Sequence, residues 1–315
     1  MKIDIIIPSH KNLSGIQKLI ESCLTVDLTC VQNIYIVLNP ENLEIERNLL
    51  KKFENQLSLR FIQTKDIGVN CARNLGVQNS TAEILLLLDD DEIITDTSLF
   101  KKHLARHMIE PELLALGGLY ELAEPTSLWS RTYHRVQIDW LLFGERLDGM
   151  NYHLLGGHIS FKRQVFEKHF FNPNIFFGGA ETEFLFRLMQ SKIICRLDAH
   201  LSILHSHRLS LISFLKKAYL QGRTHRKYSF QDTTSLHRKI LQKKFTDESR
   251  RMTEKLARKI YFLAFNLGRN YVTRKQIPTF YVRNFLLSLR RQIFLLTLRL
   301  DFLAKKIDKT GPPNA

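Results

Sequence analysis

The chain has 315 residues, of which 44% are hydrophobic, and this is enough for one large domain or for a domain with an appendage. The formal net charge of +15 is uneven, because residues 206–315 hold 25 Lys and Arg against 6 Asp and Glu. No uncharged apolar run is long enough to span a membrane, and the four cysteines have neither metal nor disulfide spacing. We therefore expect neither a transmembrane helix, nor a signal peptide, nor a disulfide framework.

Strands and helices alternate along the first ninety residues. Continuous apolar runs, rich in β-branched residues or leucine, predict four strands, and apolar residues at helical spacing predict three helices between them. The predicted elements are, in chain order, a strand at 3–8, a helix at 12–24, a strand at 33–39, a helix at 41–53, a strand at 59–64, a helix at 69–80 and a strand at 83–90. Apolar strands that alternate with helices are typical of an α/β fold with a parallel sheet covered on both faces.

Polar residues follow three of the predicted strands, and ligands of such sheets bind at the carboxyl ends of strands. Pro8, Ser9 and His10 follow the first strand, Asn39 the second, and the acidic run 89–92 the fourth. Four adjacent carboxylates repel one another and are costly to desolvate. Either the turn is solvated, or a hard cation such as Mg²⁺ or Mn²⁺, which prefers oxygen ligands, is bound there.

The order of several motifs resembles that of family 2 glycosyltransferases. A first strand ending in Pro-Ser is followed by Ala-Arg-Asn-x-Gly at 72–76, by Asp-x-Asp at 89–91, by GGAETEF at 178–184, and by a strand that ends near His205 before a basic helix. The resemblance covers residues 3–225. It implies a GT-A fold, which is Rossmann-like with a mostly parallel sheet and helices on both faces. It also implies inverting transfer of a sugar from a nucleotide-sugar to an acceptor hydroxyl.

The resemblance assigns roles to the acidic run and its neighbours. It places Asp89 near the donor ribose, with Asp90 beside it, and it places Asp91 on a divalent Mn²⁺ or Mg²⁺ ion. His205 is expected to contact the metal or the diphosphate, because a neutral imidazole beside Asp91 can be a further ligand. Arg73 is expected either to face the phosphates or to brace the aspartates. The ion would neutralise charge on the leaving nucleoside diphosphate.

The nucleotide is expected at the ends of the first two strands. Pro8, Ser9 and His10 form the predicted contact, and Asn39 can hydrogen-bond a base edge where family members often carry an acid. Asp66 either touches the base, braces the arginine of the helix motif, or lies on a loop surface. A UDP-sugar is the favoured donor, and the expected acceptor is a glycan or a lipid-linked molecule, in the synthesis of a polysaccharide or another glycoconjugate.

Glu181 is the candidate general base. The family usually has Glu-Asp-x-Asp at this point, and alignment on Arg187 places Ala180, Glu181, Thr182 and Glu183 on those four positions. A carboxylate that reaches the acceptor hydroxyl can take its proton. Alternatively, the two glutamates are acids at a helix N-terminus, which the helix dipole favours, and both interpretations can hold together.

Residues 226–315 form a second predicted region, basic and helical, after a catalytic domain at 1–225. Its last helix has an apolar stripe from Phe280 to Leu300 beside several arginines. Such a helix suits an anionic membrane surface, or the stripe packs on the catalytic domain. No nucleic-acid-binding motif is evident, so nucleic acid is not an expected partner. We expect the protein in the cytoplasm, either free or peripheral on the inner face of the cell membrane.

Two other functions remain open on the sequence. One is a nucleotidyltransferase on a related sheet, which would need a Gly-rich phosphate loop and basic residues after the first strand. The segment PSHKNLSG at 8–15 matches that requirement poorly. The other is a non-catalytic module that kept the fold and binds sugar or membrane. Metal-dependent turnover of a nucleotide-sugar would distinguish the enzyme from this module.

Overall fold

The computed structural model describes residues 1–39, 43–53, 56–65, 68–123, 127–144, 148–175, 179–206, 209–227 and 252–271. The chain divides into a compact unit, Met1–Asn270, and a second unit, Tyr271–Ala315, of which only Tyr271 is described. The predicted boundary after residue 225 therefore falls inside the first unit. The apolar stripe from Phe280 to Leu300 lies outside the described residues.

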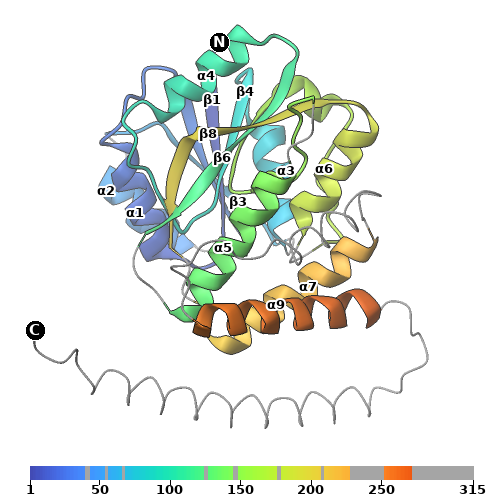
Figure 1. The fold of residues 1–315 in the computed structure, drawn as a ribbon. Coiled ribbons are helices and arrows are strands. Elements are labelled where there is room, and N and C mark those ends of the chain that lie inside the picture. Colours follow the sequence, from blue (N-terminus) through green and yellow to red (C-terminus); the bar gives the residue numbers. More distant parts are fainter. Residues whose placement is uncertain are drawn as a thin grey trace, which may run out of the picture. The chain divides into compact units, whose positions relative to one another are not determined.

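An eight-stranded sheet forms the centre of the first unit (Figure 1). Its strands lie in the order β3-β2-β1-β4-β7-β6-β8-β5. The neighbouring strands β3, β2, β1 and β4 are parallel to one another, and β6 is parallel to β8. Strand β7 is antiparallel to both β4 and β6, and β5 is antiparallel to β8. The mostly parallel sheet is thus confirmed. The strands are β1 (Ile3–Ser9), β2 (Val31–Leu38), β3 (Leu59–Gln63), β4 (Ile84–Leu88), β5 (Glu92–Ile93), β6 (Leu113–Leu122), β7 (His158–Lys162) and β8 (Ile194–His205).

Helices cover both faces of this sheet, as predicted. Side chains of α1, α2 and α4 join one hydrophobic cluster, and those of α3 and α6 join a second cluster on the other face (Figure 1). All seven elements predicted over the first ninety residues are present. The helices are α1 (Leu13–Cys23), α2 (Leu43–Phe53), α3 (Val69–Asn79), α4 (Leu99–Ile109), α5 (Leu128–Phe143), α6 (Ala180–Gln190), α7 (Leu211–Lys227) and α9 (Met252–Tyr271), with a 3₁₀ helix at Arg163–Glu167.

The leucine run of β4 follows from its central position. Ile84, Leu86 and Leu88 belong to the first cluster, and Leu85 and Leu87 to the second, so successive side chains alternate between the two faces. All five are fully buried. A strand that is covered on both faces needs an uninterrupted apolar sequence. The acidic run that follows therefore begins at the carboxyl edge of the sheet, directly after the core.

A buried carboxylate holds the opposite, amino end of the sheet together. Asp4 accepts hydrogen bonds from Ser80 Oγ at 2.6 Å and from the backbone N–H groups of Thr81, Ala82 and Asn33 at 3.0 Å each. A fifth bond comes from the Asn33 side chain at 3.2 Å. Because these donors lie on β2 and in the turn before β4, Asp4 ties three neighbouring strands to one another.

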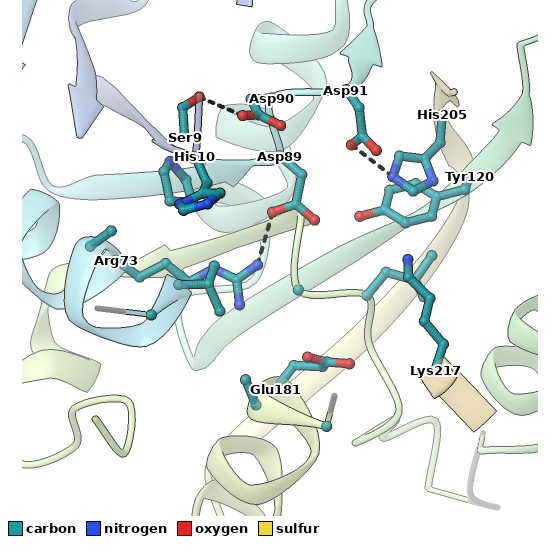
Figure 2. Close-up of a pocket in the computed structure, with 18 of the residues that line it drawn as sticks. Ser9, His10, Arg73, Asp89, Asp90, Asp91, Tyr120, Glu181, His205 and Lys217 are labelled. Carbon is teal, nitrogen blue, oxygen red and sulfur yellow. Dashed lines mark hydrogen bonds and ion pairs between the residues drawn. The ribbon is translucent and has the colours of Figure 1, made fainter. Parts of the chain in front are cut away.

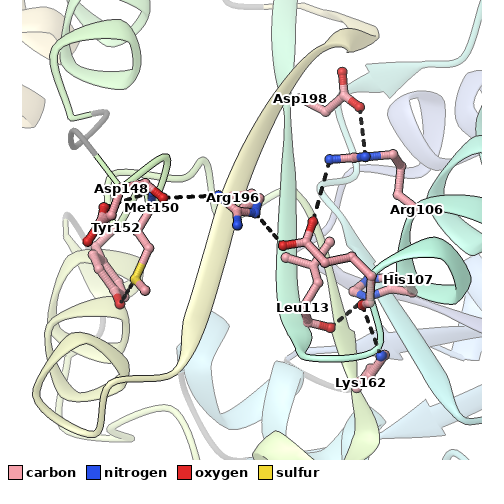
Figure 3. Close-up of polar contacts among 10 residues, drawn as sticks. Arg106, His107, Leu113, Asp148, Met150, Tyr152, Lys162, Arg196 and Asp198 are labelled. Carbon is pink, nitrogen blue, oxygen red and sulfur yellow. Dashed lines mark hydrogen bonds and ion pairs between the residues drawn. The ribbon is translucent and has the colours of Figure 1, made fainter.

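A second polar network fixes the start of β8 (Figure 3). Arg196 Nε lies 2.5 Å from Glu110 Oε1, and Arg196 Nη1 donates to the Asp148 carbonyl oxygen at 3.3 Å. Arg106 Nε lies 3.2 Å from Asp198 Oδ2. These pairs join β8 to the end of α4 and to the loop after α5. Because they are partly exposed, each stabilises the fold by only about 0–1 kcal/mol, and their main effect is on the position of β8.

Helices α5, α7 and α9 form a third hydrophobic cluster. It includes Tyr133 of α5, Phe214 of α7, and Tyr261 and Phe265 of α9. An ion pair between Arg258 and Asp139 also joins α9 to α5. Since α5 and α7 line the cavity described below, this cluster positions one of its walls. Within the described residues, no helix combines the length and apolar character needed to cross a membrane.

Candidate active site

A cavity of about 530 Å³ lies at the carboxyl ends of β1, β2 and β4 (Figure 2). Its wall draws on segments far apart in the sequence, from the first strand end to helix α7. Ten of the eleven residues that the sequence predicts for the site line it, namely Pro8, Ser9, His10, Asn39, Arg73, Asp89, Asp90, Asp91, Glu181 and His205. The eleventh, Asp66, lies outside the described residues.

Hydrogen bonds join the three strand ends at one side of the cavity. Ser9 Oγ donates to Asp90 Oδ2 at 2.5 Å, and Asn12 Nδ2 donates to both the carbonyl and a carboxylate oxygen of Asp90 at 3.1 Å. The ring of His10 donates through Nδ1 to the Asn39 carbonyl oxygen at 2.7 Å. Burial raises the pKa of Asp90, although the bonds from Ser9 and Asn12 oppose the shift. Asp90 therefore braces this side of the cavity.

Two buried side chains present donors that have no partner among the described residues. Arg73 is 3% exposed, and its Nη2 donates to Asp89 Oδ1 at 2.9 Å, but its Nε and Nη1 have no acceptor there. Asn39 accepts from the N–H of Gly68 at 3.2 Å, whereas its Nδ2 has no acceptor. A buried donor without an acceptor costs about 1–3 kcal/mol. These groups therefore indicate a ligand with oxygen acceptors, and Arg73 also braces an aspartate.

Two glycines bring the backbone close to these charged groups. A Cβ on Gly156 would lie 3.0 Å from Arg73 Nη1 and 3.2 Å from the Cβ of Glu181. A Cβ on Gly157 would lie 2.4 Å from Asp89 Oδ2. Any side chain at either position would displace the groups of the site. The two glycines thus leave room for the charged side chains to converge.

Asp89, Glu92 and His205 form a group that fits a divalent cation. Each offers a ligand atom, and these atoms all lie within 4.8 Å of one another. The pairing of β5 with β8 sets Glu92 opposite His205, and the Asp89 N–H donates to Glu92 Oε2 at 3.0 Å. Burial and the charges of Asp89 and Asp91 raise the pKa of Glu92 well above its ordinary value, and a nearby cation would oppose that shift. The carboxylate ligands of this group suit Mn²⁺ or Mg²⁺.

Asp91 and His205 lie side by side, as a shared site requires. His205 Nε2 is 3.0 Å from Asp91 Oδ1, and the ring of Tyr120 stacks on His205 with 4.3 Å between centroids. Burial alone would raise the pKa of Asp91, but the hydrogen bond and charge of His205 and the charge of Lys217 lower it overall. Which of the carboxylates holds a metal stays a prediction.

Glu181 and Glu183 share the first turn of α6 but have different surroundings. Glu183 is buried, and both of its oxygens accept from Arg187, with the shorter contact at 2.7 Å to Nε. Glu181 lines the cavity, and the described part of the chain offers it no hydrogen bond or ion pair. Gly179, at the helix N-cap, has φ +81°, a conformation that glycine adopts without strain. The carboxylate of Glu181 is therefore available to take a proton, whereas that of Glu183 is not.

Sequence reasoning missed the wall of the cavity that α5 and α7 supply. Tyr133 and Gln137 of α5 line it, together with Lys217 and Gln221 of α7. Gln221 Nε2 donates to the Tyr133 hydroxyl at 2.8 Å, and the Tyr261 hydroxyl of α9 donates to Gln221 Oε1 at 2.5 Å. The available signal was the spacing of Lys217 and Gln221, which places them on one face of the helix. The sequence counted Glu92 in the acidic run but gave it no individual role, and it did not predict Tyr120.

The glycosyl transferase family 2 model matches residues 4–170, which is more than half of the chain. The chain therefore belongs to glycosyltransferase family 2, and the resemblance seen in its motifs is confirmed. Membership supports nucleotide-sugar glycosyltransferase activity. No curated protein sequence matches the chain.

Several solved structures have a similar fold. The mannosyltransferase PcManGT from Pyrobaculum calidifontis, in complex with GDP-Man and Mn²⁺, matches with a TM-score of 0.59 and 11% identity over 91% of this chain and 80% of that chain. S. aureus TarS matches with a TM-score of 0.54 and 14% identity over 85% of this chain. The match covers only 49% of the TarS chain. TarS 1-349 in complex with UDP matches with a TM-score of 0.53 and 14% identity over 84% of this chain and 81% of that chain. Identities this low show the fold alone.

Proposed function

We propose that the protein transfers a sugar from a nucleotide-sugar to an acceptor hydroxyl, with inversion at the anomeric carbon, in this cavity. The observation that carries the proposal is that Glu181, a carboxylate with no partner in the described chain, lines the same cavity as Asp89 and His205, two members of the candidate cation group. Direct displacement needs a base for the acceptor hydroxyl and stabilisation of charge on the leaving group. Both requirements have candidate residues on facing sides of one cavity.

We propose that the nucleoside binds at the carboxyl ends of β1 and β2. Ser9 and His10 border this part of the cavity, and the Nδ2 of Asn39 is a buried donor that suits a carbonyl oxygen of a base. Uracil and guanine both carry such an oxygen, and the similar structures include complexes with UDP and with GDP-Man. A UDP-sugar remains the first candidate donor. Arg73 holds Asp89 through one nitrogen and offers its other N–H groups to phosphate oxygens.

A divalent Mn²⁺ or Mg²⁺ ion held by Asp89, Glu92 and His205, with Asp91 as a further candidate ligand, would supply neutralising charge to the donor diphosphate. Two sets of contacts hold the candidate cation ligands in place. The stacked ring of Tyr120 orients the imidazole of His205. The bonds that Asp90 receives from β1 and α1 hold the acidic turn in place.

Glu181 takes the proton of the acceptor hydroxyl as that oxygen attacks the anomeric carbon. Its lack of a partner in the described chain leaves both oxygens free for this role, and positioned bases contribute about 10²–10⁴-fold to rate. Gln137, Gln221 and Tyr133 line the wall that α5 and α7 supply. Their hydrogen-bonding groups suit the hydroxyls of a glycan or of a lipid-linked acceptor, in the synthesis of a polysaccharide or another glycoconjugate.

The basic region at 226–315 is proposed to hold the enzyme at the cytoplasmic face of a membrane. Its excess of Lys and Arg and the stripe from Phe280 to Leu300 support this proposal. Each basic residue near an anionic surface contributes about 1 kcal/mol, which salt screens. Co-sedimentation with anionic vesicles at low and high salt tests it. Full-length protein that ignores anionic vesicles at low salt contradicts it.

The activity is tested with a panel of nucleotide-sugars in the presence of Mn²⁺ or Mg²⁺. We expect one donor to raise the unfolding temperature and to be consumed, with release of a nucleoside diphosphate. Glu181→Gln should keep donor binding and lose turnover. If no donor binds with either ion, the proposal is wrong. Binding without turnover in the parent protein would favour the non-catalytic module.

A further inference from the structure

Lys217 of α7 brings a positive charge to the cavity wall. Its side chain extends toward the side where Asp91, Tyr120 and His205 lie (Figure 2). Its Nζ lies 5.1 Å from the centroid of the Tyr133 ring. In the part of the chain that the structure describes, it forms neither an ion pair nor a hydrogen bond. The ammonium group therefore keeps its donors for something that enters the cavity.

Carboxylates of the acidic turn and of the candidate base both act on the charge of Lys217. The negative charges of Asp91, Asp89 and Glu181 interact electrostatically with its Nζ, and that of Asp91 has the largest effect. Arg73, a second cation among the described residues that line the cavity, already has one nitrogen on Asp89. Burial lowers the pKa of Lys217, while the three carboxylates oppose that shift and favour the charged form. The three carboxylates thus favour a charged Lys217 at the cavity wall, although none of them pairs with it.

The residues along the cavity follow one another in an order that matches the order of nucleoside, diphosphate and sugar in a nucleotide-sugar. Ser9 and His10 lie on one side of Asp89, and Lys217 lies on the other side, with Glu181 facing both (Figure 2). A donor that places its nucleoside near Ser9 and its diphosphate near Asp89 brings its sugar end toward Lys217. The general base must lie near the anomeric carbon of the sugar, which is bonded to an oxygen of the β-phosphate. The position of Glu181 is consistent with that direction.

We infer that the Nζ of Lys217 hydrogen-bonds the β-phosphate of the donor and stabilises the charge that this phosphate gains in the reaction; the inference rests on the proposed function. The acceptor oxygen forms a bond to the anomeric carbon while the bond from that carbon to the β-phosphate oxygen breaks. The electron pair of the broken bond stays on the phosphate, and the acceptor proton passes to Glu181. Lys217 keeps its own proton, so its part is electrostatic.

A purely structural role for Lys217 is the alternative. On that alternative, the ammonium group only offsets the repulsion among the carboxylates, and its removal would destabilise the fold without affecting one part of the donor more than another. Lys217→Met tests the difference, because Met has a similar length and can still pack on the Tyr133 ring while it removes the charge. Lys216→Met is the matched control, because Lys216 is the exposed neighbour on the same helix.

The experiment measures binding of UDP and GDP, of the corresponding monophosphates and of the nucleosides to the full chain by calorimetry with Mn²⁺. For the nucleotide that the parent binds, Lys217→Met should weaken diphosphate binding about 10–100-fold and change nucleoside and monophosphate binding less than about threefold. Lys217→Arg should recover part of the loss, and Lys216→Met should match the parent. With saturating donor, kcat of Lys217→Met should fall about 10²-fold or more.

Three results would overturn the inference. Diphosphate binding that is equal in Lys217→Met and in the parent contradicts it and leaves the proposed function intact. An equal loss for nucleoside, monophosphate and diphosphate, together with a lower unfolding temperature, supports the structural role instead. A parent protein that binds none of these nucleotides contradicts the proposed function, and the inference fails with it.

Discussion

Buried polar groups at the two ends of β1 and β4 are in opposite circumstances. At the amino end, the carboxylate of Asp4 accepts five hydrogen bonds from side chains and backbone. At the carboxyl end, burial raises the pKa of Asp90 and of Glu92, and buried donors of Arg73 and Asn39 have no acceptor in the described chain. The same sheet therefore has one end where the polar groups are satisfied and one where they are not.

This difference separates groups that stabilise the fold from groups that need a ligand. A satisfied buried carboxylate contributes to the free energy of unfolding, whereas unsatisfied polar groups reduce it and are expected where a protein binds or reacts. Substitutions at the amino end should therefore change stability and leave activity intact. Substitutions at the carboxyl end should do the reverse.

The largest expected effect is on turnover, from Glu181→Gln. Gln has the size of Glu but cannot take the acceptor proton, so kcat at saturating donor should fall about 10²–10⁴-fold. The unfolding temperature should stay the same, because Glu181 has no hydrogen bond or ion pair with the described chain. If the variant keeps more than about a tenth of the parent kcat, the base lies elsewhere.

Glu183→Gln is the matched control on the same turn of α6. It loses the charged hydrogen bonds to Arg187, so its free energy of unfolding should fall by about 1–3 kcal/mol. Its kcat, measured on folded protein, should stay close to that of the parent. A large loss of kcat in this variant with unchanged stability would exchange the roles assigned to the two glutamates.

The next effect is on stability, from Asp4→Ala. The change leaves the N–H groups of Thr81, Ala82 and Asn33 without their acceptor, so we expect a loss of about 3–5 kcal/mol in the free energy of unfolding. Urea unfolding measures it. Donor affinity of the folded variant should equal that of the parent. A loss below about 1 kcal/mol would mean that the amino end does not stabilise the sheet as its hydrogen bonds indicate.

Glu92→Gln tests the cation group at the carboxyl end. The parent should gain about 2.7 kcal/mol of stability at a Mn²⁺ concentration of about 100 times the Kd, and the variant should lose most of that gain. Without the ion, the variant should be at least as stable as the parent, because Gln carries no charge into a fully buried site. An equal response to Mn²⁺ in both proteins would remove Glu92 from the ligand set and favour Asp91.

The smallest effect is a pH dependence that comes from outside the cavity. His107 Nδ1 donates to the Leu113 carbonyl oxygen at 3.1 Å, and Ser160 lies between His107 and His103 at 2.9 Å from each ring (Figure 3 shows His107 and Leu113). His103 also contacts His158. Burial lowers the pKa of His107 and of His158 to about 4, and it lowers that of His103 well below its ordinary value.

For each of these histidines, the unfolded chain binds a proton at higher pH than the folded chain does. The stability they contribute is therefore complete above pH about 6.5 and is lost as the pH falls from there toward about 4. The slope should reach about 1.4 kcal/mol per pH unit for each group. His107→Asn, in which the amide nitrogen can replace Nδ1, should show a shallower slope in urea unfolding between pH 6.5 and 5. An unchanged slope would show that His107 titrates alike in both states.

Much of the front half could be predicted because its information is local. Continuous apolar strands and helical spacing predicted all seven elements up to β4, and strand ends predicted which residues gather at the carboxyl edge. The family motifs added Arg73, Glu181 and His205 from separate segments. The cavity brings these residues together because parallel strands end at one edge and because α6 begins there.

The remaining part of the site depends on pairings that no local pattern encodes. Glu92 reads as the last acid of a polar turn, and only the pairing of β5 with β8 sets it opposite His205. Tyr120 lies on β6, whose place beside β8 follows from long-range contacts. Lys217 reads as one of many basic residues on a helix, and its approach to the cavity depends on how α5, α7 and α9 pack. Asp66 and the C-terminal stripe lie outside the described residues.

Anomalous diffraction from crystals that contain Mn²⁺ with UDP or GDP tests the proposed function most directly. We expect a single Mn²⁺ peak at coordination distance from the group formed by Asp89, Glu92 and His205, with the nucleoside beside Ser9 and Asn39 and the diphosphate directed toward Lys217. A Mn²⁺ peak away from this group, or a nucleoside bound at the Lys217 end of the cavity, would contradict the site and the direction in which the donor is proposed to bind.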